Sequence, residues 1–250
     1  IDFADYGMKA SSVRALFAEL REKTVPIAKA ITSQPPADDS CLRKHYPEAE
    51  QLAFGAEVVK QLGYDFNRGR IDKTHHPFMT KFSLGDVRIT TRVDEQFLGE
   101  ALFSTIHEAG HAMYEQGTNP ALYRLGLGSQ GSMAQGASMS VHESQSRFYE
   151  NVIGRGRPFW RYFYPKLQEF FPEQLGKVEL ETFYSGLNKS APSLIRVEAD
   201  EVTYCLHIML RFEMEKGMIN GTIPAKDIPD AWNSTMQDYL GVVPPNDTLG

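Results

Sequence analysis

The stretch His107-Glu108-Ala109-Gly110-His111 decides how the rest of the sequence is interpreted. It reads H-E-x-x-H, and on a helix residues i and i+4 lie one turn apart on the same face. Both imidazoles can therefore bind one divalent ion, while Glu108, rotated by about 100° from His107, can take a proton from water without binding that ion. The alternative is a pair of surface histidines that share a glutamate by chance, and the motif alone does not separate the two.

The residues on either side of the motif favour a buried helix. Asp94 is expected to cap it and Gly117 to end it, which predicts a helix over residues 95–116. Gly110 inside this helix costs about 1 kcal/mol relative to alanine, so we expect another backbone or a substrate to approach closely there. The apolar positions that precede the motif follow helical spacing: Leu98, Ala101, Leu102, Thr105 and Ile106.

Composition indicates an ordinary globular protein and excludes several classes of function. The 250 residues are 42% hydrophobic and 23% charged, with a net charge of -6, which argues against a nucleic-acid partner. No apolar run is long enough to span a membrane, so no membrane partner is expected. Two cysteines, Cys41 and Cys205, do not make a disulfide framework and are typical of free thiols in a reducing, cytoplasmic location.

Hydrophobic periodicity along the chain predicts a mainly α fold with a small β-sheet. The sheet is expected just ahead of the motif helix, and a further helix follows the motif after a glycine- and serine-rich segment. That order resembles the zincin arrangement, so we expect a zincin-like helical metallopeptidase fold. Further helices are predicted over residues 7–33, 47–62, 138–153, 158–170, 177–187, 198–216 and 229–240, and strands over 69–72, 81–83 and 86–91.

A catalytic zinc ion normally has three protein ligands, so a third must come from elsewhere in the chain. We favour Glu143, because it lies on a helix that is apolar on one side and follows a loop long enough to bring it back to the motif. His142 points about 100° away on that helix, and His207 lies in an apolar helix, which favours a place in the core. The alternative for Glu143 is a solvent-facing glutamate. The downstream candidates considered are His142, Glu143, Glu150, Glu198, Asp200, Glu201 and His207.

Several separate motifs occur in a fixed order along the chain. They are H-P-F at 76–78, D-x-R-x-T at 86–90, H-E-x-x-H at 107–111, H-E-S-Q at 142–145 and I-R-x-x-A-D at 195–200. In these motifs the chain resembles the thermostable, Taq-type zinc metallocarboxypeptidases over essentially its whole length. A set of motifs in order is far more specific than H-E-x-x-H alone.

The resemblance implies a ligand set, a cofactor and an activity. His107, His111 and Glu143 would bind Zn²⁺, for which Co²⁺ can substitute, and Glu108 would be the general base that later protonates the leaving amine. The family fold is a largely helical zincin with a deep groove, and its members usually form homodimers. Their activity removes single residues from the free C-terminus of peptides, with broad preference and poor action on C-terminal proline.

An exopeptidase must bind the terminal carboxylate of its substrate, and a guanidinium group does this through two hydrogen bonds. Arg88 and Arg196 are the candidates for this role. Each has an ordinary alternative, a salt bridge of Arg88 with Asp86 or of Arg196 with Asp200. His76 is a candidate donor to the oxyanion of the reaction, and its alternative is a plain turn residue before a proline.

The sequence also departs from the family pattern at its ends. A further family motif, G-x-x-Q-D-x-H-W, would begin near residues 247–250, and a long helical region normally precedes the equivalent of Ile1. We therefore expect residues 1–250 to be a single catalytic region truncated at both ends, able to bind zinc but without efficient peptidase activity. Two alternatives remain: a zincin-type endopeptidase or oligopeptidase, and a non-catalytic fragment that keeps the metal for stability.

Overall fold

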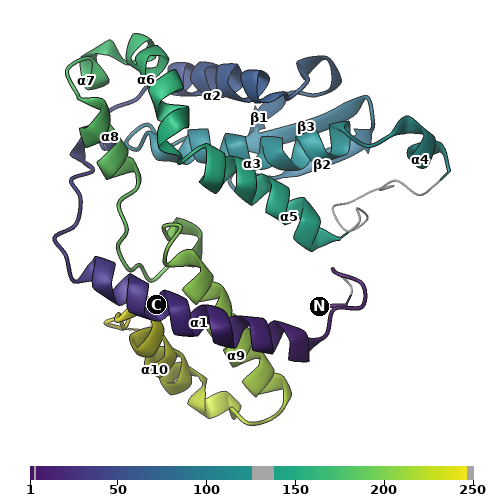
Figure 1. Ribbon diagram of the computed structural model, residues 1–250, viewed down its shortest axis with the longest axis vertical. Coiled ribbons are helices and arrows are strands. Elements are labelled where there is room, and N and C mark those ends of the chain that lie inside the picture. Colours follow the sequence, from purple (N-terminus) through teal and green to yellow (C-terminus); the bar gives the residue numbers. More distant parts are fainter. Residues whose placement is uncertain (3, 126–137, 247–250) are drawn as a thin grey trace. The chain divides into compact units, whose positions relative to one another are not determined.

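The computed structural model of the chain contains two compact units (Figure 1). Unit 1 carries the H-E-x-x-H motif and unit 2 is made of helices and connecting segments. The structure describes residues 1–2, 4–125 and 138–246. Unit 1 comprises residues 1–8 and 38–187, and unit 2 comprises residues 9–37 and 188–250.

Unit 1 is mainly helical with one small sheet, and unit 2 contains no strand among its described residues, so the predicted fold class is confirmed. The helical elements of unit 1 are η1 (Ser40–Leu42), α2 (Glu48–Leu62), η2 (Phe66–Arg68), α3 (Gly99–Gln116), α4 (Pro120–Arg124), α5 (Met139–Arg147), the π-helix η3 (Phe148–Ile153), α6 (Arg157–Phe170), α7 (Pro172–Leu175) and α8 (Leu180–Leu187). Its strands are β1 (Ile71–Lys73), β2 (Met79–Ser83) and β3 (Asp86–Thr91). Unit 2 contains α1 (Ala10–Thr32), η4 (Arg196–Glu198), α9 (Tyr204–Ile219), η5 (Ala225–Asp227) and α10 (Ile228–Leu240).

The sheet of unit 1 supports the motif helix. Its strand order is β1-β3-β2, with β1 parallel and β2 antiparallel to the central β3. On β3, burial alternates so that Val87, Ile89 and Thr91 are buried, and α3 packs against this strand (Figure 1). The Thr91 hydroxyl donates to the carbonyl of Ala101 in α3 at 3.1 Å. The outer strand β2 is left at an edge of the sheet.

The motif helix α3 begins four residues later than the sequence predicts. Asp94 does not cap it, because its carboxylate accepts a hydrogen bond from the backbone N–H of Gln96 at 2.8 Å instead. The residues that follow use their backbone in contacts with η1 and the segment before α2, and Leu98 donates to the carbonyl of Leu42 at 3.0 Å. The predicted end is confirmed at Gln116, and Gly117 keeps a right-handed conformation, with φ of -80°.

Other helix boundaries follow local capping chemistry. Ser138 caps α5 by accepting from the backbone N–H of Val141 at 3.1 Å, and Gly63 ends α2 in the left-handed conformation, with φ of 119°. The helix predicted over residues 198–216 instead begins at Tyr204. The carboxylate of Asp200 accepts from the backbone N–H groups of Val202 and Thr203, which holds these residues in turns before the helix.

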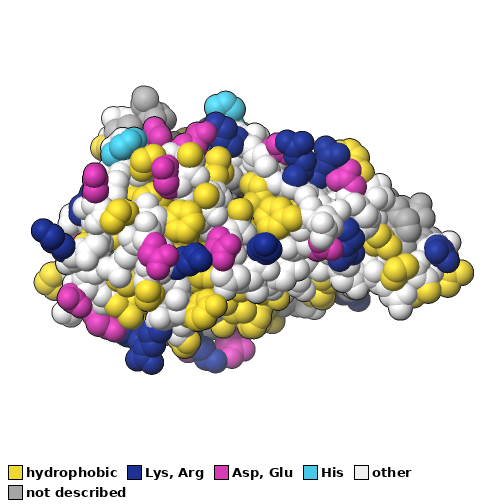
Figure 2. Space-filling view, turned by 90° about the horizontal axis from the view of Figure 1, so that it is seen from above, with side chains coloured by type: hydrophobic (Ala, Val, Ile, Leu, Met, Phe, Trp, Pro, Cys, Tyr) yellow, Lys and Arg dark blue, Asp and Glu magenta, His cyan; other side chains and the backbone are white. Residues whose placement is uncertain are grey.

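Each unit has a hydrophobic core of its own. In unit 1 the fully buried side chains include Trp160, Phe54 and Ile106, and T-shaped aromatic pairs such as Trp160 with Phe183 lie among them. In unit 2 the buried core comprises Ala28, Leu206, Met209, Leu210, Met214, Met236, Tyr239 and Leu240. Acidic, basic and hydrophobic side chains are intermixed on the face drawn in Figure 2. Within the described ranges, no helix combines the length and the hydrophobicity that crossing a membrane requires.

Candidate metal centre

Two helices of unit 1 bring the predicted ligands together. His107 and His111 lie on consecutive turns of α3, and Glu143 lies on α5, which packs against α3. One nitrogen of each histidine and one carboxylate oxygen of Glu143 all lie within 4.8 Å of one another. Glu143 Oε2 is 3.1 Å from His111 Nε2, and Oε1 is 3.7 Å from His107 Nε2. The Nε2 atoms of both histidines therefore face the same carboxylate.

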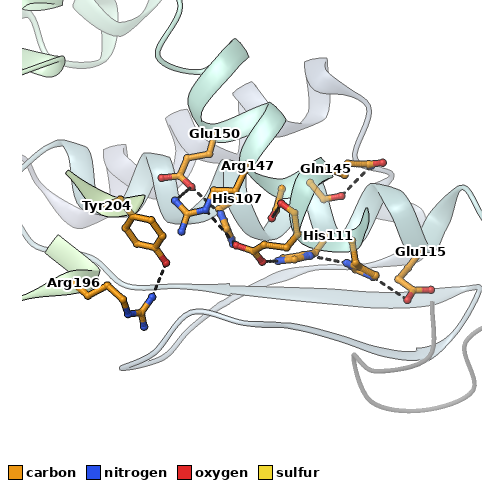
Figure 3. Close-up of polar contacts among 12 residues, drawn as sticks. His107, His111, Glu115, Gln145, Arg147, Glu150, Arg196 and Tyr204 are labelled. Carbon is orange, nitrogen blue, oxygen red and sulfur yellow. Dashed lines mark hydrogen bonds and ion pairs between the residues drawn. The ribbon is translucent and has the colours of Figure 1, made fainter. Parts of the chain in front are cut away.

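Gly110 allows α5 to approach the motif helix this closely. A Cβ at this position would lie 2.6 Å from the Cα of Ser146, a distance that real Cβ atoms essentially never show. The side-chain amide of Gln145 donates to the carbonyl of Gly110 at 3.1 Å, which ties the two helices at the same point (Figure 3). The expectation that another backbone approaches Gly110 is confirmed.

The remaining nitrogen of each histidine is held from the opposite side. His107 Nδ1 lies 2.8 Å from a carboxylate oxygen of Glu150, and His111 Nδ1 lies 2.6 Å from Nδ1 of His142 (Figure 3). Contacts of this kind orient metal-binding histidines and set which nitrogen carries the proton. With both Nδ1 atoms engaged, two Nε2 atoms and one carboxylate remain for an ion. This N, N, O donor set fits a catalytic zinc site.

Arg147 links the third ligand to the carboxylate that supports His107. Its Nε donates to Glu143 at 3.2 Å, and its Nη1 donates to Glu150 at 3.2 Å. Glu150 lies on the π-helix η3 that continues α5, and helices of this type often occur at functional sites. Sequence reasoning weighed Glu150 only as a possible ligand and did not consider Arg147. The signal was present, because residues 143, 147 and 150 recur at helical spacing on one face.

Burial and neighbouring charges set unusual pKa values in this cluster. Burial raises the pKa of Glu143, but the hydrogen bond from His111 and the charges of His107, His111 and Arg147 outweigh it and lower that pKa to about 2. Burial lowers the pKa of His107, but the hydrogen bond to Glu150 and the charges of the surrounding carboxylates outweigh burial. The pKa of His107 is therefore raised above its ordinary value. Burial lowers the pKa of His111. Glu143 is thus ionised and ready to bind a cation at neutral pH.

Glu108 has the opposite character. Its side chain is buried, and this burial, together with the negative charges of Glu143 and Glu150, raises its pKa to about 7. A hydrogen bond with the backbone of Met79 and the nearby His107 act in the lowering direction and only partly offset the burial. Met79 is the first residue of the edge strand β2, so the carboxyl group of Glu108 contacts that strand. A carboxyl group with this pKa can both take and return a proton near neutral pH.

The predicted substrate-binding residues occupy separate places. Arg88 on β3 donates two hydrogen bonds to Asp86, from Nε to Oδ1 and from Nη2 to Oδ2, each at 2.8 Å. This is the salt bridge that the sequence offered as the alternative for Arg88. Arg196 lies in unit 2 and donates to the hydroxyl of Tyr204 (Figure 3). His76 is exposed in the connection between β1 and β2. Within unit 1, no contact recorded among the described residues joins Arg88 or His76 to the three predicted ligands.

Helical metallopeptidases are defined by an H-E-x-x-H helix, a third donor from a second helix and a buried glutamate. The arrangement of His107, His111, Glu143 and Glu108 fits this class. The whole chain, residues 1–250, matches the family described as Carboxypeptidase Taq (M32) metallopeptidase. The chain belongs to this family, and the resemblance found in its motifs is confirmed.

The curated relatives that the chain matches are named as carboxypeptidases. The chain is 45% identical to Carboxypeptidase 1 of Bacillus subtilis, with 100% of this chain and 49% of the relative covered. It is 43% identical to Thermostable carboxypeptidase 1 of Thermus thermophilus, with 98% of this chain and 47% of the relative covered. The chain thus spans about half the length of the curated relatives that it matches.

Solved structures agree with the fold. The M32 carboxypeptidase of Deinococcus radiodurans superimposes with a TM-score of 0.93 at 45% identity, over 100% of this chain and 49% of that one. Metallocarboxypeptidase 1 of Trypanosoma cruzi superimposes with a TM-score of 0.84 at 32% identity, over 100% of this chain and 50% of that one. Both similarities extend over the two units described above.

Proposed function

We propose that residues 1–250 form the zinc-binding catalytic region of a metallocarboxypeptidase, which hydrolyses the C-terminal peptide bond of peptides with broad specificity. The observation that carries the proposal is the convergence of His107, His111 and Glu143 beside the buried carboxyl group of Glu108. A divalent ion bound by this set would activate a water molecule and polarise the peptide carbonyl. Zn²⁺ suits two imidazoles and a carboxylate, and Co²⁺ is the proposed substitute.

In this proposal Glu108 moves the proton. With a pKa of about 7, it is ionised in a substantial fraction of molecules at neutral pH and can accept a proton from the attacking water. Its protonated form is also stable in this buried setting, so it can hold the proton until the amine leaves and then return it. The hydrogen bond with the backbone of Met79 keeps the carboxyl group against strand β2.

Arg88, Arg196 and His76 are proposed to act on the substrate. A guanidinium group can bind the free carboxylate through two hydrogen bonds, which makes a free C-terminus a requirement. Asp86 already holds Arg88 by such a two-point pair, so its guanidinium is oriented before any substrate binds. His76 is exposed next to the edge strand, where a donor to the developing oxyanion would be useful.

The remaining features of the proposal rest on the family resemblance and on the sequence. We propose that residues 1–250 act as one catalytic region, that the protein is a homodimer and that it works in the cytoplasm. The two cysteines support a reducing location: Cys41 and Cys205 are both free thiols, and Cys41 is buried.

The test compares peptide substrates with free and amidated C-termini. The zinc-loaded intact protein should release the last residue from the free peptide, and amidation should abolish this release, both followed by mass spectrometry. Cleavage of the amidated peptide at internal bonds would instead show an endopeptidase. Glu108→Gln is the matched control, because it removes the base but no metal ligand. Zinc binding without any cleavage by either protein would show a metal-stabilised, non-catalytic region and would refute the proposal.

A further inference from the structure

We propose that Arg196 and Arg211 of unit 2 together form a binding site for one carboxylate group. Both residues, and all the side chains that contact them, belong to unit 2. The inference rests on the proposed function in one respect, because that function already assigns the free carboxylate of the substrate to Arg196 as a candidate. Arg211 is the new residue, and it makes this a site of two cations for one anion.

The two arginines contact the same face of helix α9. Tyr204, His207 and Arg211 lie at i, i+3 and i+7 on that helix, so their side chains share one face. Arg196, in η4 before the helix, donates from Nη1 to the Tyr204 hydroxyl at 2.5 Å (Figure 3). Arg211 turns back along the helix and donates from Nη1 to the carbonyl of His207 at 3.2 Å. The residues that receive the two guanidinium groups are thus less than one helical turn apart.

No acidic side chain in a recorded contact balances these two charges. Among the described residues, neither guanidinium group forms a hydrogen bond or ion pair with a carboxylate. Burial, and then the charge of Arg196, lower the pKa of Arg211. Burial and the charges of both arginines lower the pKa of His207 to about 4, so this imidazole is neutral at pH 7. The cluster therefore carries two positive charges that repel each other, and an anion bound to both would offset that repulsion.

Asp200, the acidic residue that the sequence offered as a partner for Arg196, is engaged elsewhere. Five donors reach its carboxylate, three backbone N–H groups and two hydroxyl groups, and they come from Ser190, Ala191, Val202 and Thr203. These hydrogen bonds shape the loop that precedes α9. No contact between Asp200 and Arg196 is recorded within the described ranges, so the salt-bridge alternative for Arg196 is not formed.

Both arginines leave open the edge of the guanidinium group that suits a carboxylate. Arg88 shows how this edge is used, because its Nε and Nη2 donate to the two oxygens of Asp86. The recorded hydrogen bonds of Arg196 and Arg211 use Nη1 alone. In the part of the chain that the structure describes, Nε and Nη2 of both arginines thus have no recorded acceptor, and each pair can donate to an incoming carboxylate.

Aromatic rings hold the two guanidinium groups before any anion binds. The guanidinium carbon of Arg211 lies 5.1 Å from the centre of the Trp232 ring in α10, and that of Arg196 lies 5.6 Å from the centre of the Tyr204 ring. Contacts with an aromatic face restrain a guanidinium group without using its N–H donors. The donors are therefore oriented in advance, which lowers the entropy lost when a carboxylate binds.

Acetate, with acetamide as its neutral counterpart, is the probe that tests this site. Nitrogen-15 NMR of the intact, metal-free protein follows the Nε–H signals of both arginines during each titration. Acetate should move both signals along one saturable curve, and acetamide should move neither. Arg211→Met keeps an apolar side chain against Trp232 and removes the charge, so the acetate affinity measured on Arg196 should fall about tenfold or more.

Arg21→Met is the matched control for this variant. Arg21, also in unit 2, donates to the hydroxyl of Tyr239 at 2.8 Å and lies over that ring, as Arg196 does with Tyr204. The hydrogen bond with Tyr239 and the charge of Glu213 raise the pKa of Arg21, so its charged neighbour is an acid and not a second guanidinium group. Arg21→Met should bind acetate as tightly as the wild type.

Kinetics of the zinc-loaded protein distinguish two sources of the carboxylate. If the site takes the C-terminus of the substrate, Arg211→Met should raise KM for a free peptide about tenfold with little change in kcat. If the site takes a free small carboxylate, KM should stay at the wild-type value while the variant still loses acetate binding. Both outcomes support a site for one carboxylate, and they differ only in where that carboxylate comes from.

Three results would overturn the inference: a saturable acetate response at only one arginine or at neither, an equal response to acetamide, or wild-type acetate affinity in Arg211→Met. If Arg211→Met does not fold, the wild-type titration still decides, together with Arg211→Lys, which keeps the charge but loses the two-point edge and should bind acetate more weakly. Failure of the proposed function is distinguishable, because the titration needs neither zinc nor turnover.

Discussion

Replacing Gly110 by alanine should separate the two helices that carry the metal ligands. The new Cβ would lie 2.6 Å from Ser146 Cα and 3.2 Å from the carbonyl oxygen of Gln145, both backbone atoms that cannot rotate away. Carbon atoms in contact prefer about 3.5–4.0 Å, so α5 must move by roughly 1 Å. Overpacking of this kind costs about 1–3 kcal/mol, and the better helix propensity of alanine returns about 1 kcal/mol. The net loss of folding stability is therefore about 1 kcal/mol.

Gly110→Ala should weaken zinc binding more than it lowers the stability of the fold. Glu143 is carried by the helix that moves, and its carboxylate lies 3.1 Å from His111 Nε2 before any movement. We expect zinc affinity to fall at least about tenfold, the scale at which disturbed supporting contacts weaken a metal site. Chelator competition on the intact protein measures the affinity, and chemical denaturation of the metal-free protein measures the stability.

Gly55→Ala is the matched control for this experiment. Gly55 is a helical glycine of α2 that also faces α3, but a Cβ there would meet Thr105 at 3.6 Å, an ordinary contact. This variant should keep wild-type zinc affinity and gain up to about 1 kcal/mol of stability from helix propensity. A Gly110→Ala protein with unchanged affinity and unchanged stability would refute the reasoning that close packing of α3 and α5 builds the site.

Three further changes test other parts of the account. In the metal-free protein, burial raises the pKa of the Glu108 carboxyl group from 4.5 to about 7. The stability that its protonated form contributes is therefore complete below pH 4.5 and is lost as the pH rises through 7, so Glu108→Gln should be more stable than the wild type by about 3 kcal/mol at pH 8. A difference between the two proteins that does not change with pH in denaturation experiments would contradict this. Glu150→Gln should weaken zinc binding about tenfold by loosening the contact with His107, and an unaltered affinity in chelator competition would argue against that role. Arg88→Lys should raise KM for peptides with a free C-terminus while changing stability by less than about 1 kcal/mol, since its pair with Asp86 is partly exposed; steady-state kinetics with an unchanged KM would count against substrate binding by Arg88.

The sequence is most informative where one spacing rule governs the outcome. H-E-x-x-H places two histidines on one helical face, and the structure brings both within reach of Glu143, the residue chosen for its position on an apolar-sided helix. Because glycine inside a helix costs stability, Gly110 predicted a close backbone contact. Its partner, the backbone of α5 at Ser146, became visible only in the fold.

The helix boundaries show where local rules yield to tertiary contacts. Asp94 has the chemistry of a helix cap, but the backbone after it bonds to segments more than forty residues earlier in the chain, such as the contact of Leu98 with Leu42. No local pattern encodes such a contact. The same limit explains the two units, because unit 2 joins residues 9–37 to residues 188–250 across the whole of the intervening sequence.

The supporting residues of the metal centre were the least predictable part. Glu115 lies near the end of helix α3 and Lys81 lies on the edge strand β2. By sequence alone, charged residues at such places are typical of exposed positions. Only the packing of β2, α3 and α5 buries them together beside His142. The roles of His76, Arg88 and Arg196 stay predictions, and the family motif expected near residues 247–250 lies outside the described residues.

The central claim is that one ion binds to His107, His111 and Glu143, and anomalous scattering from crystals of the zinc-loaded intact protein tests it most directly. The account predicts a single strong peak at the zinc absorption edge in unit 1, bonded to Nε2 of both histidines and to the carboxylate of Glu143. No peak at this position, or a zinc ion held by other residues while these three remain unbound, would contradict it.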